Sequence, residues 1–241
     1  MTQPQFTKSI KASSKPHNFC PGCGHPIVLQ ALAEVIDELD LQDKTVIGLD
    51  IGCSLLAWDF FDVDSTQTHH GRTGPVMSGF KKVKPDSVGI VYMGDGGAYA
   101  IGAQHLVNEA MRNEPLTVIV VNNSLYAMTG GQEAATTLPE QKTSTTPYGS
   151  DQNLLDGPKM VETITNQEAY VARGTIDNPT QLKSFIRKAI KNQLRSKGFS
   201  FVEALSVCPT NWKTDAKQTF SFLNNMKKTF PVKEYKIPKS L

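Results

Sequence analysis

The sequence predicts an α/β protein, with a mostly parallel sheet that carries helices on both faces. Short apolar strands alternate with helical segments along the chain, which is the order of elements found in parallel sheets. Several of these strands are apolar throughout, as is typical of strands buried on both faces. Glycine turns at 52, 94 and 130 each follow a strand. Ligands of such sheets bind beyond the carboxyl ends of the strands, so we expect these turns to converge on one edge.

The first part of the chain contains an arm, a helix and a strand. Residues 1–19, rich in Ser, Thr, Lys and Pro, predict an extended arm. Residues 27–39 place apolar side chains at helical spacing and predict a helix. Residues 45–52 form a β-branched run that ends in glycine, which predicts a buried strand. Little regular periodicity follows in 53–85, which we expect to be irregular and which contains HHGR at 69–72.

The second part of the chain repeats the alternation of strand and helix. A strand at 87–97 runs into a glycine turn, a helix is expected at 98–112, and a strand follows at 116–123. Residues 133–157, rich in Thr, Pro and Gly, predict a long loop. The remaining predicted elements are a helix near 159–166, a strand near 169–173, a helix at 180–195, a strand at 199–206 and a helix near 215–229.

Composition excludes several classes of protein. Hydrophobic residues make up 39% and charged residues 20% of the 241 residues, which is ordinary for a globular chain and excludes a disordered or collagen-like one. No apolar run reaches the roughly 20 residues that a membrane-spanning helix needs, so no membrane contact is expected. The N-terminus has no apolar segment of the kind that secretory signals carry. We therefore expect a cytoplasmic protein.

Charge is distributed unevenly along the chain, although its net value is only +2. Residues 181–241 contain 13 lysines and arginines against 3 acidic residues, and residues 1–180 contain 12 against 20. The basic C-terminal tail, 209–241, suits docking of an acidic partner, although a solvated lysine-rich surface is the simpler alternative. The tail has neither an aromatic platform interleaved with its basic residues nor a recognised nucleic-acid-binding motif, so no nucleic-acid partner is expected.

The strongest local motif is GDGG at 94–97, between a predicted strand and a predicted helix. Glycines let a ligand approach the backbone, and a helix N-terminus favours a phosphate. Asp95 would repel that phosphate unless a cation lay between them. Asn123 ends the next predicted strand, so both side chains are expected at one sheet edge, where they would offer oxygen ligands to Mg²⁺. A purely structural turn is the alternative.

Four cysteines, at positions 20, 23, 53 and 208, form a second group. Disulfides are rare in the cytosol, so these residues predict a metal site or buried thiols. The Cys20-Pro-Gly-Cys23 spacing suits chelation of one metal, while Cys53 and Cys208 each follow a predicted strand. In a parallel sheet Cys53 and Cys208 would both lie at the edge that carries Asp95. Four thiolates suit either a [4Fe–4S] cluster or Zn²⁺, and the residues alone leave both open.

The motifs occur in an order that resembles one known family. In GDGG with Asn123, the chain is similar to the thiamine-diphosphate signature. The whole set resembles the β subunit of 2-oxoacid:ferredoxin oxidoreductases, the subunit that binds thiamine diphosphate, from about residue 15 to 215. The motifs are CPGCGH at 20–25, IGCS at 51–54, HGR at 70–72, GDGG at 94–97, NNSLYAMTGGQ at 122–132 with TT at 136–137, and CPTNW at 208–212.

The resemblance implies a thiamine-diphosphate-binding fold over residues 20–208, in the half that holds the diphosphate. It implies a [4Fe–4S] cluster on Cys20, Cys23, Cys53 and Cys208, and Mg²⁺ on Asp95, Asn123 and the carbonyl of Leu125. It also implies a catalytic role for His70, with His25 and His69 as weaker candidates and His105 as structural. The implied cofactor-binding residues are Ile51, Gly52, Cys53, Ser54, His70, Gly94, Asp95, Gly96, Gly97, Asn123, Leu125, Tyr126, Met128 and Thr129.

The resemblance also implies a reaction: oxidative decarboxylation of a 2-oxoacid to acyl-CoA and CO₂, with coenzyme A as cosubstrate and electrons passing through the cluster to ferredoxin. The wording of CPGCGHP and CPTNW is similar to members acting on 2-oxoisovalerate. Apolar residues at 55–57 would suit its isopropyl group better than a second carboxylate. 2-Oxoglutarate and pyruvate are the alternative substrates. Gly97 departs from the acidic residue that many members carry after GDG.

The resemblance further implies partners. An α subunit would supply the domain that faces the aminopyrimidine, giving a heterodimer. Ferredoxin is the expected electron acceptor, and a small ferredoxin-like subunit is a further candidate partner. Two other functions remain open from the residues themselves. One is a non-redox thiamine-diphosphate decarboxylase whose four cysteines hold zinc, and the other is a zinc-stabilised α/β binding module without enzymatic activity.

Overall fold

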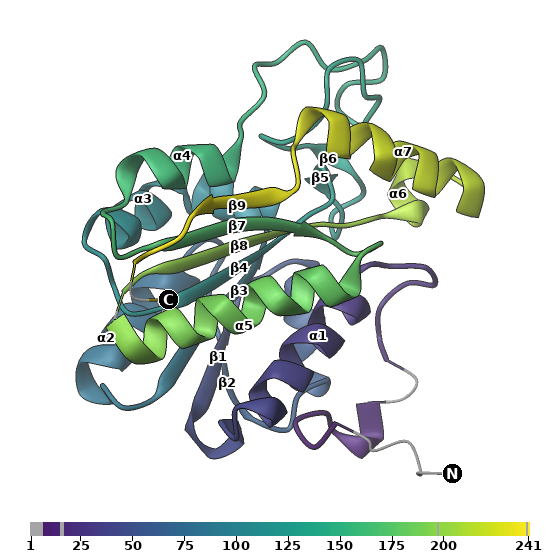
Figure 1. The fold of residues 1–241 in the computed structure, drawn as a ribbon. Helices are drawn as coiled ribbons and strands as arrows, with labels where there is room; N and C mark the ends of the chain where they lie inside the picture. The colour runs from purple at the N-terminus through teal and green to yellow at the C-terminus, as the bar shows by residue number, and fades with distance from the viewer. Residues whose placement is uncertain (1–6, 15–16, 197, 240) are drawn as a thin grey trace.

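The computed structural model describes residues 7–14, 17–196, 198–239 and 241. A seven-stranded sheet forms its centre, in the order β2-β1-β3-β4-β8-β7-β9 (Figure 1). Neighbouring strands are parallel except β9, which runs antiparallel to β7, so the predicted mostly parallel sheet is confirmed. The strands are β1 (Thr45–Leu49), β2 (Asp64–Gln67), β3 (Val88–Gly94), β4 (Thr117–Asn122), β7 (Tyr170–Thr175), β8 (Ser200–Leu205) and β9 (Lys233–Lys236), with a separate hairpin of β5 (Leu125–Tyr126) and β6 (Gln132–Glu133).

Helices cover both faces of this sheet (Figure 1). On one face α1 (His25–Glu38) and α5 (Pro179–Ser196) pack against each other. The opposite face carries α2 (Thr73–Val83), α3 (Ala103–Met111) and α4 (Gly157–Ile164). Within the described ranges, no helix combines the length and the apolar character needed to cross a membrane.

Strand β3 shows why the central strands are apolar throughout. Ile90 and Tyr92 belong to the core that α1 and α5 cover, whereas Val91 and Met93 belong to the core beneath α2, α3 and α4. Successive side chains of a strand point to opposite faces, so a strand covered on both sides needs an apolar residue at every position.

Residues 53–85 are more regular than predicted. They form a 3₁₀ helix at Cys53–Asp59, the edge strand β2 and the helix α2. Helix α2 has the sequence TGPVMSGFKKV, in which glycine and proline are poor helix formers. Its buried side chains, among them Met77, stabilise it by packing against the sheet, which a reading of local periodicity does not detect.

The C-terminal residues form two helices and one strand, and the strand joins the central sheet. The helix predicted near 215–229 is α7 (Ala216–Thr229), which starts with a capping box between Asp215 and Gln218. A short helix, α6 (Pro209–Trp212), precedes it. Strand β9, which the sequence did not predict, pairs with β7 at the edge of the sheet. The division into an arm, a binding domain and a tail stays a prediction.

The described part of the N-terminal arm packs against the domain. Ser9 is buried, and its hydroxyl donates a hydrogen bond of 2.5 Å to Oδ1 of Asp37 on α1. Ile10 forms an isolated β-bridge with Phe61, and a 3₁₀ turn follows at Ala12–Ser14. Residues 1–6, 15 and 16 of the predicted arm lie outside the described residues.

Candidate functional site

A pocket of about 170 Å³ lies at the carboxyl ends of β1, β3 and β4. The parallel topology brings the loops after these strands to the same edge. Gly52 and Gly94 line the pocket as expected, and Gly130 lies next to Thr129, which also lines it. All the residues predicted to bind the cofactor line this pocket: Ile51, Gly52, Cys53, Ser54, His70, Gly94, Asp95, Gly96, Gly97, Asn123, Leu125, Tyr126, Met128 and Thr129. Their binding role stays a prediction.

The GDGG turn is closely packed where it enters the pocket. A side-chain carbon added at Gly96 would lie 2.2 Å from Cε1 of Tyr126. One added at Gly97 would lie 2.0 Å from Oδ2 of Asp50. Asp50 therefore occupies the space that a side chain at position 97 would need. The helix predicted at 98–112 begins as a π-helical turn, Gly97–Ile101, before α3 continues it.

Asp95 is a buried carboxyl group at the end of β3, only 3% exposed. The Thr136 hydroxyl donates to its Oδ2 at 2.6 Å, and the backbone N–H of Gly96 donates to its Oδ1 at 2.9 Å. Burial raises the pKa of Asp95 to about 7, and the charge of Glu203 adds to this effect. A bound cation would stabilise the ionised carboxylate, so the residue suits a metal ligand.

The segment after β4 brings further oxygen ligands to the pocket. Ser124 has a φ of +60°, so the chain turns sharply after Asn123. The side-chain oxygen of Asn122 accepts the N–H of Ser124 at 3.0 Å and supports this turn. Asn123 is buried and lines the pocket together with Leu125. Carboxylate, amide and carbonyl oxygens form the ligand set that Mg²⁺ prefers.

The HGR segment forms a wall of the pocket through His70. Gly71 has a φ of +65°, and a side-chain carbon there would lie 2.5 Å from the backbone nitrogen of Gly102. Arg72 is exposed, and its Nη1 lies 2.9 Å from Nε2 of His105. Arg72 and His105 thus hold the segment from outside the pocket, whereas His70 lines it.

Asp50 is a pocket residue that the sequence reasoning missed. It is 1% exposed and lines the pocket directly after β1. Its Oδ1 accepts the N–H of Gly71 at 2.7 Å and the Thr73 hydroxyl at 3.2 Å, while its Oδ2 has no hydrogen-bond partner. Burial raises its pKa. The available signal was a carboxylate in an otherwise apolar strand, TVIGLDIG.

Leu55, Leu56 and Ala57 do not form the expected apolar wall. The two leucines pack against the core beneath α1 and α5, and Ala57 is buried within it. None of the three lines the pocket. The argument for a branched substrate based on these residues is therefore not supported.

Two loops that carry three of the cysteines pack against each other. Gly22 has a φ of +76°, and a side-chain carbon there would lie 3.3 Å from Cγ of Pro209. One at Gly24 would lie 2.2 Å from Oγ of Ser206. These close approaches bring the CPGCG loop against the segment that ends in Cys208. The remaining cysteine, Cys53, lines the pocket.

All four cysteines are free thiols, and burial raises the pKa of three of them, Cys23, Cys53 and Cys208. It raises the pKa of Cys23 to about 11 and that of Cys53 to about 12, and mutual repulsion of the thiolates adds to both. A metal centre would be needed to hold them as thiolates. Within the part of the chain that the structure describes, no three His, Cys, Asp or Glu side chains converge as closely as a single metal ion requires.

The CPTNW segment joins the cysteines to the pocket. The Asn211 amide donates to the carbonyl of Ala127 at 2.9 Å and to the sulfur of Cys208 at 3.4 Å. The indole of Trp212 donates to the carbonyl of Asn123 at 3.1 Å. This short segment therefore carries one of the cysteines and also bonds to the loop that bears the predicted Mg²⁺ ligands.

His25 also lines the pocket, from the start of α1. Its Nδ1 lies 2.7 Å from the hydroxyl of Tyr92, and burial lowers its pKa to about 4. The ring is therefore neutral at physiological pH. Tyr92 is fully buried, and the charges of Cys23 and Cys53 contribute to its raised pKa. The pair thus lies near Cys23 and Cys53, at the wall of the pocket.

Comparison with known proteins agrees with this geometry. Residues 50–204 match the family model of the thiamine pyrophosphate enzyme C-terminal TPP binding domain. The ketoisovalerate oxidoreductase subunit VorA of Methanothermobacter thermautotrophicus is 38% identical over 91% of this chain. The 2-oxoglutarate synthase subunit KorB of Methanocaldococcus jannaschii is 41% identical over 84% of this chain and 73% of its own length. The chain spans only 47% of the length of VorA.

A solved structure shows the same arrangement of elements. The 2-oxoglutarate:ferredoxin oxidoreductase of Magnetococcus marinus, solved with 2-oxoglutarate, coenzyme A and succinyl-CoA bound, superposes with a TM-score of 0.77 at 30% identity, over 90% of this chain and 71% of that one. Relatives named for ketoisovalerate and for 2-oxoglutarate are about equally similar, so similarity alone does not identify the substrate. The chain belongs to the thiamine pyrophosphate enzymes, among the β subunits of the 2-oxoacid:ferredoxin oxidoreductases.

Proposed function

We propose that this chain is the β subunit of an enzyme that converts a branched-chain 2-oxoacid, 2-oxoisovalerate, and coenzyme A into acyl-CoA and CO₂, and passes the electrons to ferredoxin. One observation carries the proposal. The pocket that gathers the GDGG turn and Asn123 also has Cys53 in its wall. A cofactor bound there would lie beside the cysteine site, as electron transfer between them requires.

The residues present fit thiamine diphosphate with Mg²⁺. Asp95, Asn123 and the Leu125 carbonyl would hold the cation, and the start of the helical turn after Gly94 would receive the diphosphate. The cofactor, when bound, supplies a nucleophilic thiazolium that acts as an electron sink. His70 lies in the pocket wall, where its imidazole would hydrogen-bond the substrate or transfer a proton.

Four cysteines would suit a [4Fe–4S] cluster, and the likeness to proteins named as ferredoxin oxidoreductases favours iron over zinc. The backbone N–H of His25 donates to the sulfur of Cys23, and the side-chain amide of Asn211 donates to the sulfur of Cys208. Such hydrogen bonds tune cluster potentials. Cys20, Cys23, Cys53 and Cys208 would hold the cluster.

Charge in the pocket favours 2-oxoisovalerate over 2-oxoglutarate. Among its described lining residues there is no lysine or arginine, whereas Asp50 and Asp95 are both present. A second substrate carboxylate would find no cation from this chain, and an unpaired buried charge is costly. Pyruvate remains the alternative with a smaller side chain.

The proposed enzyme needs partners. The relatives are named as subunits, and no glutamate, the residue that would face an aminopyrimidine, is among the described residues that line the pocket. An α subunit would provide the aminopyrimidine side, and ferredoxin would take the electrons in the cytoplasm. A small ferredoxin-like subunit is a further candidate.

The proposal is tested by anaerobic purification of the full chain with any accompanying subunit, followed by iron, sulfide and zinc analysis. We expect about four irons per chain with matching sulfide. Cys23→Ser should lose the iron, whereas Ser206→Ala, a change beside Gly24 in the adjoining segment, should keep it. One zinc without iron would overturn the redox proposal in favour of a decarboxylase or a binding module.

Substrate choice is tested by the rate of ferredoxin reduction with coenzyme A and each 2-oxoacid. We expect kcat/KM for 2-oxoisovalerate to exceed that for 2-oxoglutarate by about tenfold or more, because burial of the extra carboxylate of 2-oxoglutarate is unfavourable. A preference for 2-oxoglutarate would show that another subunit supplies the missing cation and would overturn the substrate assignment.

A further inference from the structure

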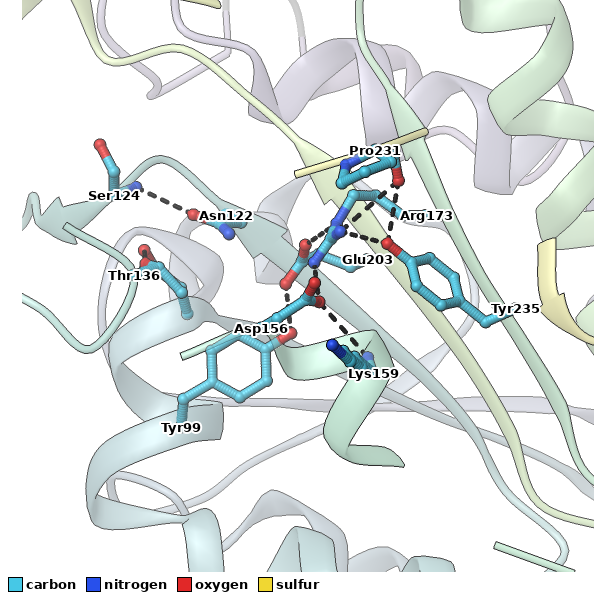
Figure 2. A network of polar contacts seen from close by, with 11 residues as sticks. Tyr99, Asn122, Ser124, Thr136, Asp156, Lys159, Arg173, Glu203, Pro231 and Tyr235 are labelled. Carbon is cyan, nitrogen blue, oxygen red and sulfur yellow. Dashed lines mark hydrogen bonds and ion pairs between the residues drawn. The ribbon is translucent and has the colours of Figure 1, made fainter. Parts of the chain in front are cut away.

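A buried ion pair lies in the sheet below the pocket. Arg173 on β7 and Glu203 on β8 are register partners, and both are fully buried. Nε of Arg173 lies 2.5 Å from Oε1 of Glu203 (Figure 2). Removing two charges from water costs more than a pair recovers unless every remaining donor and acceptor is also satisfied. The contacts that satisfy this pair therefore indicate its role.

The second oxygen of Glu203 leads to the GDGG turn. The hydroxyl of Tyr99 donates a hydrogen bond to Oε2 of Glu203. Tyr99 lies in the π-helical turn that follows Gly97, four residues after Asp95. Its ring fits only because residue 157 is glycine, where a side-chain carbon would lie 2.1 Å from the tyrosine hydroxyl. Glu203 thus anchors the π-helical turn that begins two residues after Asp95.

The other side of Arg173 leads back to Asp95 by a second route. Nη2 of Arg173 lies 2.6 Å from Oδ1 of Asp156, which also caps α4 (Figure 2). The residue before Asp156, Leu155, donates its N–H to the carbonyl of Ala135 at 3.0 Å. Thr136, the residue after Ala135, donates its hydroxyl to Oδ2 of Asp95. The contacts thus form a closed ring through Asp95.

Arg173 has little capacity left for a ligand. Its Nη1 donates to the Tyr235 hydroxyl at 2.5 Å and lies 3.5 Å from the Pro231 carbonyl. The guanidinium also lies over the rings of Phe230 and Tyr235, with its carbon 4.9 Å and 5.4 Å from the two centroids. Its polar and π contacts are therefore made within the chain, and a structural task fits it better than binding a substrate carboxylate.

We propose that Tyr99, Glu203 and Arg173 are positioning residues that fix Asp95 for cation binding. The ring holds Asp95 from both sides, through Tyr99 along the backbone and through Thr136 at the side chain. The inference rests on the proposed function, because it takes Asp95 as a ligand of the Mg²⁺ that carries the diphosphate. It adds three residues that do not line the pocket.

The test opens the ring at one atom with Tyr99→Phe. The matched control is Tyr170→Phe, because Tyr170 is also fully buried and its hydroxyl donates to a glutamate, Glu234, at 2.8 Å. Glu234 lies on β9, outside the ring. The full chain with its accompanying subunit is titrated with Mg²⁺ at saturating thiamine diphosphate by calorimetry. Mn²⁺ then replaces Mg²⁺, and its electron paramagnetic resonance spectrum reports the ligand geometry.

Tyr99→Phe is expected to weaken Mg²⁺ binding about tenfold and to alter the Mn²⁺ spectrum, since a hydrogen bond to a charged group contributes on that scale. Tyr170→Phe should leave both unchanged. Glu203→Gln alters the ring at a different residue and is also expected to weaken Mg²⁺ binding. It provides the test if Tyr99→Phe does not fold. A Tyr99→Phe protein with a lower melting temperature but unchanged affinity and spectrum would overturn the inference. A wild-type protein that binds no Mg²⁺ with thiamine diphosphate would instead overturn the proposed function.

Discussion

Glu109 on α3 is a buried acid for which the fold provides little compensation. It is 6% exposed, and its Oε1 has no hydrogen-bond partner. Its carboxyl group lies against Gly74, where an added side-chain carbon would be 2.1 Å away. Burial raises its pKa to about 8, and repulsion from Glu114 adds to this effect, while Arg112 opposes it. Glu109 lines a surface groove whose other lining residues include Lys82 and His105.

Glu109→Gln is therefore expected to stabilise the chain in a pH-dependent way. The raised pKa means that the folded chain binds more protons than the unfolded chain between about pH 4.5 and 8, so the stability of the wild type falls as pH rises through this window. Glutamine does not ionise, so the variant lacks this loss. Its free energy of unfolding at pH 8 should exceed that of the wild type by about 2 kcal/mol. Urea unfolding at pH 4 and pH 8 measures the difference. An equal effect at both values would contradict the prediction.

Individual residues were predictable where a motif marks them and not where only packing does. Asp95 and Asn123 follow recognisable turns, and both line the pocket. Asp50 and Tyr99 have no motif, because their roles arise from contacts with Gly97 and Glu203 that lie far away in the sequence. Such pairings depend on the order of strands in the sheet, which local patterns do not encode.

Among the elements, the HGR segment crosses close to the end of the π-helical turn. Gly71 approaches Gly102 and has a positive φ, so a side chain there is both strained and obstructed. Gly71→Ala is expected to lower the free energy of unfolding by about 2 kcal/mol or more. Chemical denaturation measures this loss.

Gly79→Ala is the matched control for that substitution. Gly79 lies within α2, and an added side-chain carbon there meets no atom within 4 Å. Alanine should therefore stabilise the helix by up to about 1 kcal/mol. If both glycine variants shifted stability in the same direction, the account of Gly71 as a crossing point would be wrong.

Elements were predicted well where periodicity is strong. Helices α1, α5 and α7 and the central strands lie within a few residues of their expected ranges. Helix α2 and strand β9 were missed because tertiary packing overrides weak local preference in the first, and because KEYK carries no strand pattern of its own in the second. The π-helical turn was likewise read as regular helix.

At the scale of the whole molecule, the basic charge of the C-terminal residues is partly used within the chain. Nζ of Lys227 on α7 lies 2.5 Å from Oδ2 of Asp177. Lys217 and Lys228 on the same helix are exposed. Only charges of the second kind are suited to steer an acidic protein such as ferredoxin.

Lys217→Ala with Lys228→Ala is accordingly expected to slow ferredoxin reduction several-fold at low salt and to have little effect at high salt. Stopped-flow measurement of ferredoxin reduction at two ionic strengths provides the data. Lys227→Ala is the control and should leave the rate near that of the wild type, because Asp177 already neutralises its charge. Equal rates for the double variant and the wild type at low salt would exclude this helix as a docking site.

Topology explains why the pocket was more predictable than its surroundings. Once the strands are parallel, the residues after each strand must meet at one edge, so sequence position alone places Gly52, Gly94 and Asn123 together. The supporting ring through Arg173 and Glu203 joins strands that are neighbours in the sheet but lie 30 residues apart. The sequence of neither strand, β7 or β8, identifies the other as its neighbour in the sheet.

Strand β9 has a consequence for the solubility of the chain. Strand β7 is buried along its whole length, and without β9 it would present a row of unpaired amide and carbonyl groups. Such apolar edges recruit strands from other molecules and lead to aggregation. The opposite edge, β2, is protected by its own polar residues, Asp-Ser-Thr-Gln. A chain cut before Lys233 would therefore lose its protection against fibril-like self-association at one edge only, while its pocket residues would all still be present.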